Sequence, residues 1–339
     1  MDETLPITSS DDSAIKRASR STDIHVGVTA DMVQDNARVT GIAVGAIQGP
    51  VTINVSGPAV DLAAIRRAAV QALLQPVLDL RAFEPVTIPI PGGPFRMGRA
   101  DPAAPVWERS CTVNLPDYRI GRYPVMVREY AAFITDVKAQ PAPSGWFNRE
   151  PPAGLLDHPV TNVSWCDAVA YCAWLSEQCK PRRYVLPSEA EWEKATSWEM
   201  ADWEIGKLGG GKRRYPWGAE WAEGRCNAAS SGTTAVTAHP AGASGYGVED
   251  LLGNVQEWTR SLWGSQPGQP DFGYPYDRKH GREIIAPTKL PAQARLVHRG
   301  GSFKSQPADL RCTARGNALP DSRIAWRGFR VAMILEEPT

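Results

Sequence analysis

The sequence predicts an α+β fold, in which a large domain of low regular secondary structure follows a small β-rich module. Three observations predict it. Among 339 residues there are 12 Trp, 30 Gly and 29 Pro, a composition typical of long structured loops packed around indole rings. Hydrophobic residues alternate with polar ones in short runs between residues 22 and 55, which is the period of a strand. Beyond these runs, a few short amphipathic helices are separated by loop segments rich in Gly and Pro.

The N-terminal quarter of the chain predicts a tail and a small module. Residues 1–21 are rich in Ser, Asp and Thr, and we expect a disordered tail there. In residues 22–83, three alternating runs separated by glycines predict short strands with tight turns. Asp61 then caps a predicted helix that begins at Leu62 and ends its regular part at Pro76. The module is too small for a deep pocket, so we expect an adaptor or oligomerisation element; a structural extension of the main domain is an equal alternative.

Residues 84–337 form the predicted main domain, which contains three short helices. An apolar face that starts at Val127 predicts the first. Ser164 and Ser188 stand where helix N-caps are expected, and Glu191 completes a capping box with Ser188. Because the segments between the helices are rich in Pro and Gly, we expect loops there.

Charge, hydropathy and cysteine spacing indicate the partners and the cellular compartment to expect. The 37 Lys and Arg residues balance 37 Asp and Glu, so the net charge gives no reason to expect nucleic acid or an anionic membrane as a partner. No run approaches 18 apolar residues, and the polar N-terminus lacks the apolar region of a secretory signal. We therefore expect a cytoplasmic protein whose six cysteines are reduced. No CxxC, HxH or HxxxH spacing of the zinc-binding type is present.

The stretch from Arg299 to Val331 is the one around which the chain is organised. It is dense in arginine, lacks a regular period and is punctuated by Gly and Pro. Apolar residues at its two ends, Val297 and Phe329, indicate irregular loops held by a packed scaffold. Loops on a rigid frame are where binding and catalysis usually take place, so we expect the function here.

A series of short motifs resembles the formylglycine-generating-enzyme (sulfatase-modifying factor) family in content and order. They lie at residues 93–98, 120–125, 159–172, 186–193, 215–218, 245–247, 253–259, 299–303 and 328–331. Examples are Gly-Asn-Val at 253–255, Gly-Gly-Ser-Phe at 300–303 and Gly-Phe-Arg at 328–330. The resemblance spans about three quarters of the chain, residues 86–334. It implies a single loop-rich domain related to the C-type lectin fold.

The family includes copper-dependent oxidases that convert a sulfatase cysteine to formylglycine, iron-dependent sulfoxide synthases, and ligand-binding proteins without known catalysis. The resemblance places the second of the oxidases' two copper(I)-binding cysteines at Cys312, but the first falls at Pro307. Unless Cys226 or Cys179 reaches that site, we interpret Cys312 as a small buried hydrophobe. An oxidase that acts on a cysteine of a substrate protein, with Cys312 as its catalytic residue, is the alternative. The clustered histidines and the added helical domain that an iron enzyme needs are absent.

Calcium is the cofactor that the resemblance implies. One structural ion of the family would be held here by Asp250, Gly253, Val255 and Glu257. Two carboxylates and two backbone carbonyls in a tight loop suit a hard cation. Alternatively, the two carboxylates bond backbone amides of the same loop without metal. A second family site would begin at Asn227, but the acidic residue expected downstream of it is missing.

The remaining polar residues of the Arg-rich stretch predict a recognition surface. Arg299, Arg315, Asp321 and Arg330 are candidates for partly buried ion pairs that join the loops. The predicted ligand-binding residues are Ser302, Lys304, Gln306, Asp309, Arg311, Arg315, Asn317, Arg323, Trp326 and Arg327. Their mixture of charge, amide and aromatic groups is typical of binding surfaces. We therefore predict a module that binds a protein or a small molecule through this loop surface.

Two narrower hypotheses follow from resemblance. Retroelement-diversified members of the family vary just before Gly-Phe-Arg, and here Lys304, Gln306 and Trp326 would have to be fixed positions, because the variable codons do not encode them. Residues 44–53 are similar to short adaptor segments of prokaryotic conflict-system proteins. This similarity predicts that residues 22–83 pass a binding signal to an effector, such as a protease or NTPase, or self-associate.

Overall fold

The computed structural model describes residues 25–33, 36–44, 50–56, 80–197 and 213–334. Two compact units make up the chain, Met1–Leu78 with Glu337–Thr339 and Asp79–Glu336. The predicted tail of residues 1–21 and the helix predicted from Leu62 lie outside the described residues.

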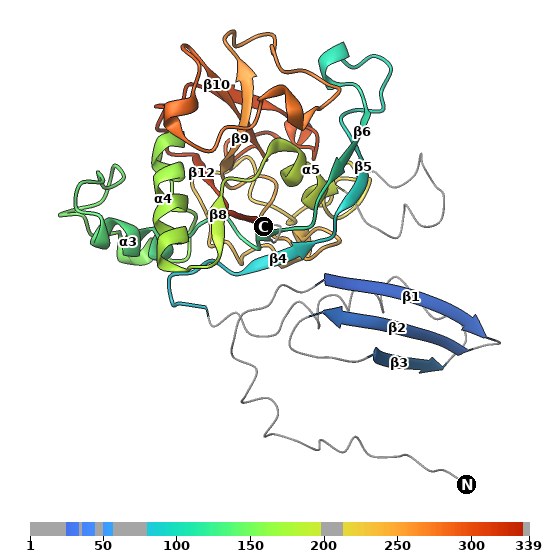
Figure 1. Cartoon of the computed structure of the whole chain (residues 1–339). Helices are drawn as coiled ribbons and strands as arrows, with labels where there is room; N and C mark the ends of the chain where they lie inside the picture. The colour runs from blue at the N-terminus through green and yellow to red at the C-terminus, as the bar shows by residue number, and fades with distance from the viewer. Residues whose placement is uncertain (1–24, 34–35, 45–49, 57–79, 198–212, 335–339) are drawn as a thin grey trace, which may run out of the picture. The chain divides into compact units, whose positions relative to one another are not determined.

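The first unit contains a three-stranded antiparallel sheet in the order β1-β2-β3 (Figure 1). Its strands are β1 (His25–Val33), β2 (Asn36–Val44) and β3 (Pro50–Ser56). Each strand falls on one of the alternating runs, so the strand predictions for this region are confirmed. The register pairs Val28 with Gly41 and Gly41 with Val51, which places these three residues on one face of the sheet.

The second unit is built on two four-stranded sheets and a hairpin, all of short strands. One sheet has the order β4-β7-β13-β8, the other β11-β10-β9-β12, and β5 pairs with β6. The strands are β4 (Thr87–Ile90), β5 (Gly93–Met97), β6 (Cys111–Leu115), β7 (Tyr118–Gly121), β8 (Arg183–Val185), β9 (Gln256–Gly264), β10 (Arg295–Arg299), β11 (Gly316–Ala318), β12 (Arg327–Phe329) and β13 (Ala332–Ile334). Loops connect most of them, which confirms the predicted fold of low regular secondary structure.

The three predicted helices are present as α3 (Val127–Asp136), α4 (Trp165–Gln178) and α5 (Glu189–Ser197). The Asp167 amide donates to Ser164 Oγ at 3.1 Å and the Glu191 amide to Ser188 Oγ at 3.2 Å, so both predicted serine caps are confirmed. Single 3-10 turns form η1 (Val106–Glu108), η2 (Ala153–Leu155), η3 (Pro240–Gly242), η4 (Arg278–His280), η5 (Pro287–Lys289) and η6 (Pro307–Asp309). Within the described ranges, no helix is long and apolar enough to cross a membrane.

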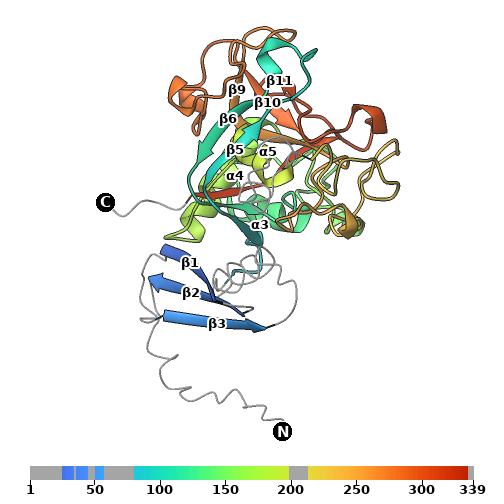
Figure 2. The ribbon, with the colours of Figure 1, turned by 90° about the vertical axis from the view of Figure 1, so that its right-hand side faces the viewer.

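Two apolar clusters form the core of the second unit. The first includes Trp165, Tyr171 and Phe329, and joins α3 and α4 to β9 and β12. It also contains Cys172, which is 2% exposed, a small residue packed in the core. The second surrounds Trp192 of α5. Helix α5 contacts β5 and β6 as well as β9 and β10 (Figure 2), and so links the hairpin to the sheet from which the Arg-rich stretch continues.

Candidate functional site

Two carboxylates on α5 form buried ion pairs with arginines of the C-terminal stretch. Arg299 Nη1 lies 3.0 Å from Glu189 Oε1, and Arg299 Nη2 lies 2.5 Å from Glu193 Oε2. Arg315 Nε lies 2.6 Å from the same Glu189 Oε1. Burial alone would raise the pKa of Glu189, but the two guanidiniums outweigh it and hold this pKa below its ordinary value. The pairs therefore remain charged, although these four side chains are all 0% exposed.

A second buried ion pair joins Glu257 of β9 to Arg330, the residue that follows β12. Arg330 Nε lies 2.6 Å from Glu257 Oε2, and the Trp192 indole donates to the same oxygen at 2.9 Å. The expected ion pairs of Arg299, Arg315 and Arg330 are thus confirmed, while Asp321 is exposed and takes no part in them. We call Glu189, Glu193 and Glu257, with Arg299, Arg315 and Arg330, the ion-pair scaffold. Arg315, which we also predicted to bind ligand, is committed to this scaffold.

Three other predicted ligand-binding residues are occupied by contacts within the chain. Arg323 makes two hydrogen bonds to the carboxylate of Asp167, at 2.8 and 2.9 Å. Asn317 accepts from Arg295 Nε at 2.5 Å and donates to the Pro267 carbonyl at 3.0 Å. Ser302 is 2% exposed, and its hydroxyl accepts from the backbone amide two residues later at 3.3 Å. Asn317 and Ser302 are thus held within the loops, whereas Arg323 is tied to Asp167 but still exposed to solvent.

The residues around η6 are more open. Gln306 and Asp309 are exposed at the two ends of this turn. Arg311 is half-buried, and its Nε has no hydrogen-bond partner among the described residues. Burial and the nearby Arg99 lower the pKa of Arg311. This part of the predicted surface therefore offers charge, but the structure shows no contact that joins its three residues to one another.

Lys304 and Trp326 form the clearest open contact of the predicted set. The Lys304 Nζ lies 3.9 Å from the centroid of the Trp326 ring, a cation–π distance. Lys304 is exposed and Trp326 half-buried. The Gln256 amide donates to the Trp326 carbonyl at 2.9 Å, which fixes the backbone that carries the indole to the start of β9.

Arg327, the next residue, is 5% exposed. It donates from Nε to Gln256 Oε1 at 3.1 Å and from Nη1 to Ser322 Oγ at 3.2 Å. Its guanidinium carbon lies 4.5 Å from the Trp258 ring centroid. We call Lys304, Trp326 and Arg327, with Gln256 and Ser322, the cationic site, because Gln256 contacts both Trp326 and Arg327.

Gln256, Trp258 and Ser322 were not among the predicted site residues. Gln256 and Trp258 flank Glu257, which we had considered only as a metal ligand. Their involvement follows from parallel pairing of β12 with β9, which sets Arg327 opposite Gln256 and Phe329 opposite Trp258. A strand pairing between residues about 70 positions apart leaves no local pattern in the sequence, so no sequence signal identified them.

Three of the predicted calcium ligands, Asp250, Gly253 and Val255, lie in the loop before β9 and Glu257 lies within β9, and the set only partly suits a cation. Asp250 is 7% exposed and accepts a hydrogen bond from Asn254 Nδ2 at 2.8 Å. Both Glu257 oxygens are already bonded, to Arg330 and to the Trp192 indole. No cluster of three His, Cys, Asp or Glu side chains with metal-ligand geometry occurs in the described ranges. Burial raises the pKa of Asp250 to about 8, so this carboxyl is mostly protonated at neutral pH unless a cation displaces the proton, whereas the charge of Glu257 is balanced by a guanidinium. Calcium stays a prediction.

Cys312 is 0% exposed, and its thiol lies 3.9 Å from the Thr196 carbonyl. Cys226 and Cys179, the two possible second copper ligands, lie near the carboxyl groups of Asp250 and Glu84, respectively. The pKa of Cys226 is raised to about 12 by burial and by Asp250, and that of Cys179 is raised to about 11 by burial and by Glu84. Pro307, at the position of the missing cysteine, begins η6.

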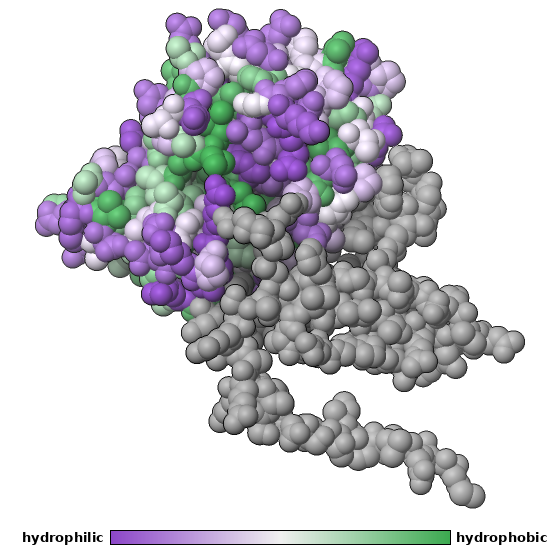
Figure 3. Space-filling view, in the orientation of Figure 1, coloured by the Kyte–Doolittle hydropathy of each residue, from purple (hydrophilic) through white to green (hydrophobic). Residues whose placement is uncertain are grey.

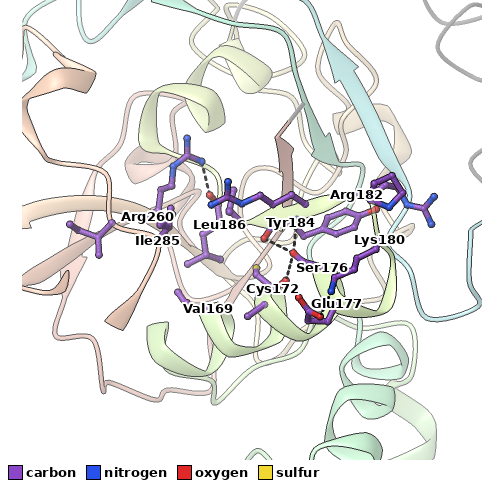
Figure 4. Close-up of a pocket in the computed structure, with 15 residues that line it drawn as sticks. Val169, Cys172, Ser176, Glu177, Lys180, Arg182, Tyr184, Leu186, Arg260 and Ile285 are labelled. Atoms are coloured by element: carbon purple, nitrogen blue, oxygen red, sulfur yellow. Dashed lines mark hydrogen bonds and ion pairs between the residues drawn. The ribbon is translucent and has the colours of Figure 1, made fainter. Parts of the chain in front are cut away.

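A pocket of about 390 Å³ lies elsewhere, between α4, β8 and the segment that carries Ile285 (Figure 4). Figure 3 shows apolar residues gathered on the face where α4 and β8 lie. Ser176 lines the pocket and joins α4 to β8, because its hydroxyl donates to the Cys172 carbonyl and accepts from the Tyr184 amide, both at 2.8 Å. None of the predicted ligand-binding or metal-binding residues lines this pocket.

The short strands, the capped helices and the Arg-rich loops held by ion pairs define an irregular α+β domain of the C-type-lectin-like type. The chain belongs to the sulfatase-modifying factor family: residues 77–335 match the sulfatase-modifying factor enzyme 1-like domain.

Named relatives include enzymes of different activities. The chain is 34% identical over 278 residues to "Hercynine oxygenase" of Mycolicibacterium smegmatis, covering 72% of this chain and 60% of the relative. It is 31% identical over 310 residues to "Formylglycine-generating enzyme" of Thermomonospora curvata, covering 72% of this chain and 92% of the relative. The chain thus spans about three fifths of the hercynine oxygenase, so that whole protein's activity does not transfer with the match.

Solved structures share the fold. PvdO from Pseudomonas aeruginosa aligns with a TM-score of 0.53 at 24% identity, over 75% of this chain and 96% of that structure. Treponema denticola variable protein 1 aligns with a TM-score of 0.51 at 23% identity, over 73% of this chain and 94% of that structure. At this level of identity the likeness shows the architecture, and the function must be argued from the site.

Proposed function

We propose that this chain is a binding module that recognises a protein or a small molecule through the cationic site. The Lys304–Trp326 contact is the observation that carries the proposal. The amine lies on the face of a half-buried indole and forms no ion pair within the described part of the chain. Exposed aromatic and cationic groups on a fixed backbone are typical of recognition surfaces. The ion-pair scaffold supplies the rigid support that such loops need.

Arrays of glycans, peptides and nucleotides test the proposal. Wild type, Lys304→Ala/Trp326→Ala and Lys289→Ala would be probed side by side; Lys289 is an exposed lysine of η5 outside the cationic site. We expect a ligand that wild type and the Lys289 variant retain and that the double variant loses by tenfold or more. A ligand retained equally by all three proteins would place recognition elsewhere and overturn the proposal.

A copper-dependent oxidase is the second candidate function, because a formylglycine-generating enzyme is among the relatives and Cys312 stands at one of the two expected cysteine positions. An anaerobic copper(I) titration of the reduced protein, repeated with Cys312→Ala, separates the two candidates. A tight one-to-one site that disappears in the variant, together with turnover of a cysteine-containing peptide, would establish the oxidase. Absence of a specific site supports the binding module.

We further propose that the first unit transmits the bound state to an effector, or self-associates. The similarity of residues 44–53 to conflict-system adaptor segments supports this role. Light scattering of the full chain tests self-association, and a monomer at micromolar concentration would leave the effector role and the structural extension of the main domain. The retroelement-diversified version requires a template repeat and a reverse transcriptase gene beside this one; a genome without them removes it.

A further inference from the structure

Five arginine residues of the second unit are 5% exposed or less: Arg260, Arg282, Arg299, Arg327 and Arg330. Arg260, Arg299 and Arg330 contact carboxylates at 3.0 Å or less. Arg282 donates to the Gly273 and Phe272 carbonyls at 3.0 and 2.7 Å and lies near enough to Glu189 to lower the pKa of that carboxyl. Buried guanidiniums are ordinarily paired in this way.

Arg327 differs from Arg260, Arg299 and Arg330, which contact carboxylates, and from Arg282, which lies near enough to Glu189 to lower the pKa of that carboxyl. Its contacts in the described ranges are the neutral side chains of Gln256 and Ser322 and the face of Trp258. A guanidinium has five N–H donors, and the two hydrogen bonds use two of them. No ion pair to Arg327 occurs in the part of the chain that the structure describes. The side chain is therefore a buried cation whose charge is not balanced there.

The charged groups that face Arg327 add to this imbalance. Burial and, to a smaller extent, the nearby Arg295 lower the pKa of Arg327 to about 10, so the guanidinium still carries its charge at neutral pH. His298 packs edge-to-face with the same Trp258, with ring centroids 6.2 Å apart. Burial, Arg327 and Arg295 lower the pKa of His298 to about 3, so this ring is neutral and offers no further charge. No carboxylate is among the groups that shift either pKa.

We propose that Arg327 binds an oxyanion group of the ligand, such as a carboxylate or a phosphate. A planar guanidinium presents paired N–H donors that match such a group. Trp258 and the hydrogen bonds to Gln256 and Ser322 hold the guanidinium in place before the ligand arrives, which reduces the entropy lost on binding. The inference rests on the proposed binding function and adds the chemical class of the group that the site takes.

Thermal unfolding of the full chain with inorganic phosphate tests the inference. Phosphate would be compared with chloride at equal ionic strength for wild type, Arg327→Gln and Arg128→Gln. Arg128 is an exposed arginine of α3 paired with Asp157, so its variant matches the loss of charge. At saturating phosphate we expect a rise in Tm of about 2–4 °C in wild type and in the Arg128 variant, and none in the Arg327 variant.

The possible outcomes differ in meaning. Equal rises in all three proteins would reflect adventitious or excluded-salt effects of phosphate and overturn the inference, as would no rise in any of them. If Arg327→Gln fails to fold, Arg327→Lys replaces it and must weaken the phosphate response at least threefold, since a lysine keeps the charge but lacks the paired N–H donors that match an oxyanion. If phosphate has no effect but the arrays find a ligand that the double variant loses, the oxyanion inference is wrong and the binding function stands. If phosphate stabilises the protein through Arg327 but the arrays find no ligand, the oxyanion site stands and the proposed binding function loses its support.

Discussion

The ion-pair scaffold and the cationic site each contain a buried arginine, but the two arginines have different partners. Arg330 and Arg327 are three residues apart, and they are 0% and 5% exposed. Arg330 meets Glu257 at 2.6 Å, whereas Arg327 meets only neutral side chains and an indole. Arg330 is therefore balanced by a carboxylate within the fold, and we propose that the unbalanced charge of Arg327 is used for a ligand. On this account the partner of a buried arginine decides its role.

The largest expected effect comes from removing a scaffold carboxylate. Glu189→Gln would leave Arg299 and Arg315 with one carboxylate, Glu193, between them, in a fully buried setting. We expect a loss of about 3–5 kcal/mol in the free energy of unfolding, measured by urea denaturation. Glu177→Gln, which breaks an exposed pair with Lys180, is the matched control and should cost below about 1 kcal/mol. Equal losses would mean that the scaffold pairs contribute no more than surface pairs.

Glu129 extends the comparison to an acid that is buried without a paired cation. Its carboxylate accepts from the Met126 amide at 2.8 Å, and burial raises its pKa to about 7. The folded state therefore holds this proton more tightly than the unfolded state, so stability falls as pH rises from about 4.5 to about 7 and is flat above that. Glu129→Gln should reduce the loss of unfolding free energy between pH 5 and pH 8 by about 2–3 kcal/mol. If Glu129→Gln has the same pH dependence of the unfolding free energy as wild type, ionisation of Glu129 does not destabilise the folded state.

Adding calcium tests whether the loop at Asp250 binds a metal ion. Asp250 is buried with an amide as its hydrogen-bond donor, in contrast to Glu257 beside Arg330. We expect millimolar calcium to raise the Tm of the wild type by about 2–4 °C and to leave Asp250→Asn unchanged. Magnesium serves as the control ion, because its demand for near-octahedral geometry suits this loop poorly. If calcium has no effect on wild type, the predicted structural ion is absent.

The smallest effect on stability is expected at the open contact. Lys304 is exposed, and its cation–π contact with Trp326 is worth about 0.5–1 kcal/mol at such a site. Lys304→Ala should therefore change the free energy of unfolding by less than about 1 kcal/mol while it weakens ligand retention on the arrays. A large loss of stability would assign Lys304 to the scaffold instead.

The sequence predicted the local features well and the long-range pairs poorly. The serine caps of α4 and α5 and the alternating strands of the first unit depend on neighbouring residues, and these predictions were confirmed. The ion pairs of Arg299 and Arg330 were anticipated, but not their partners: Glu189 lies 110 positions from Arg299, and Glu257 appeared to be a metal ligand. The sequence analysis assigned Arg330 to an ion pair and Arg327 to the ligand-binding surface, but the physical reason for the difference is visible only in the folded chain, which sets Gln256 beside Arg327 and Glu257 beside Arg330.

Urea denaturation of Arg330→Gln and Arg327→Gln, in buffer free of phosphate and sulfate, tests the central comparison most directly. Loss of Arg330 leaves Glu257 buried without its cation, and we expect a decrease of about 3–5 kcal/mol in the free energy of unfolding. Loss of Arg327 removes a buried charge that has no counter-charge, which offsets the lost hydrogen bonds and stacking, so we expect a change within about 1 kcal/mol. If Arg327→Gln costs as much as Arg330→Gln, Arg327 belongs to the scaffold and the distinction between the two regions fails.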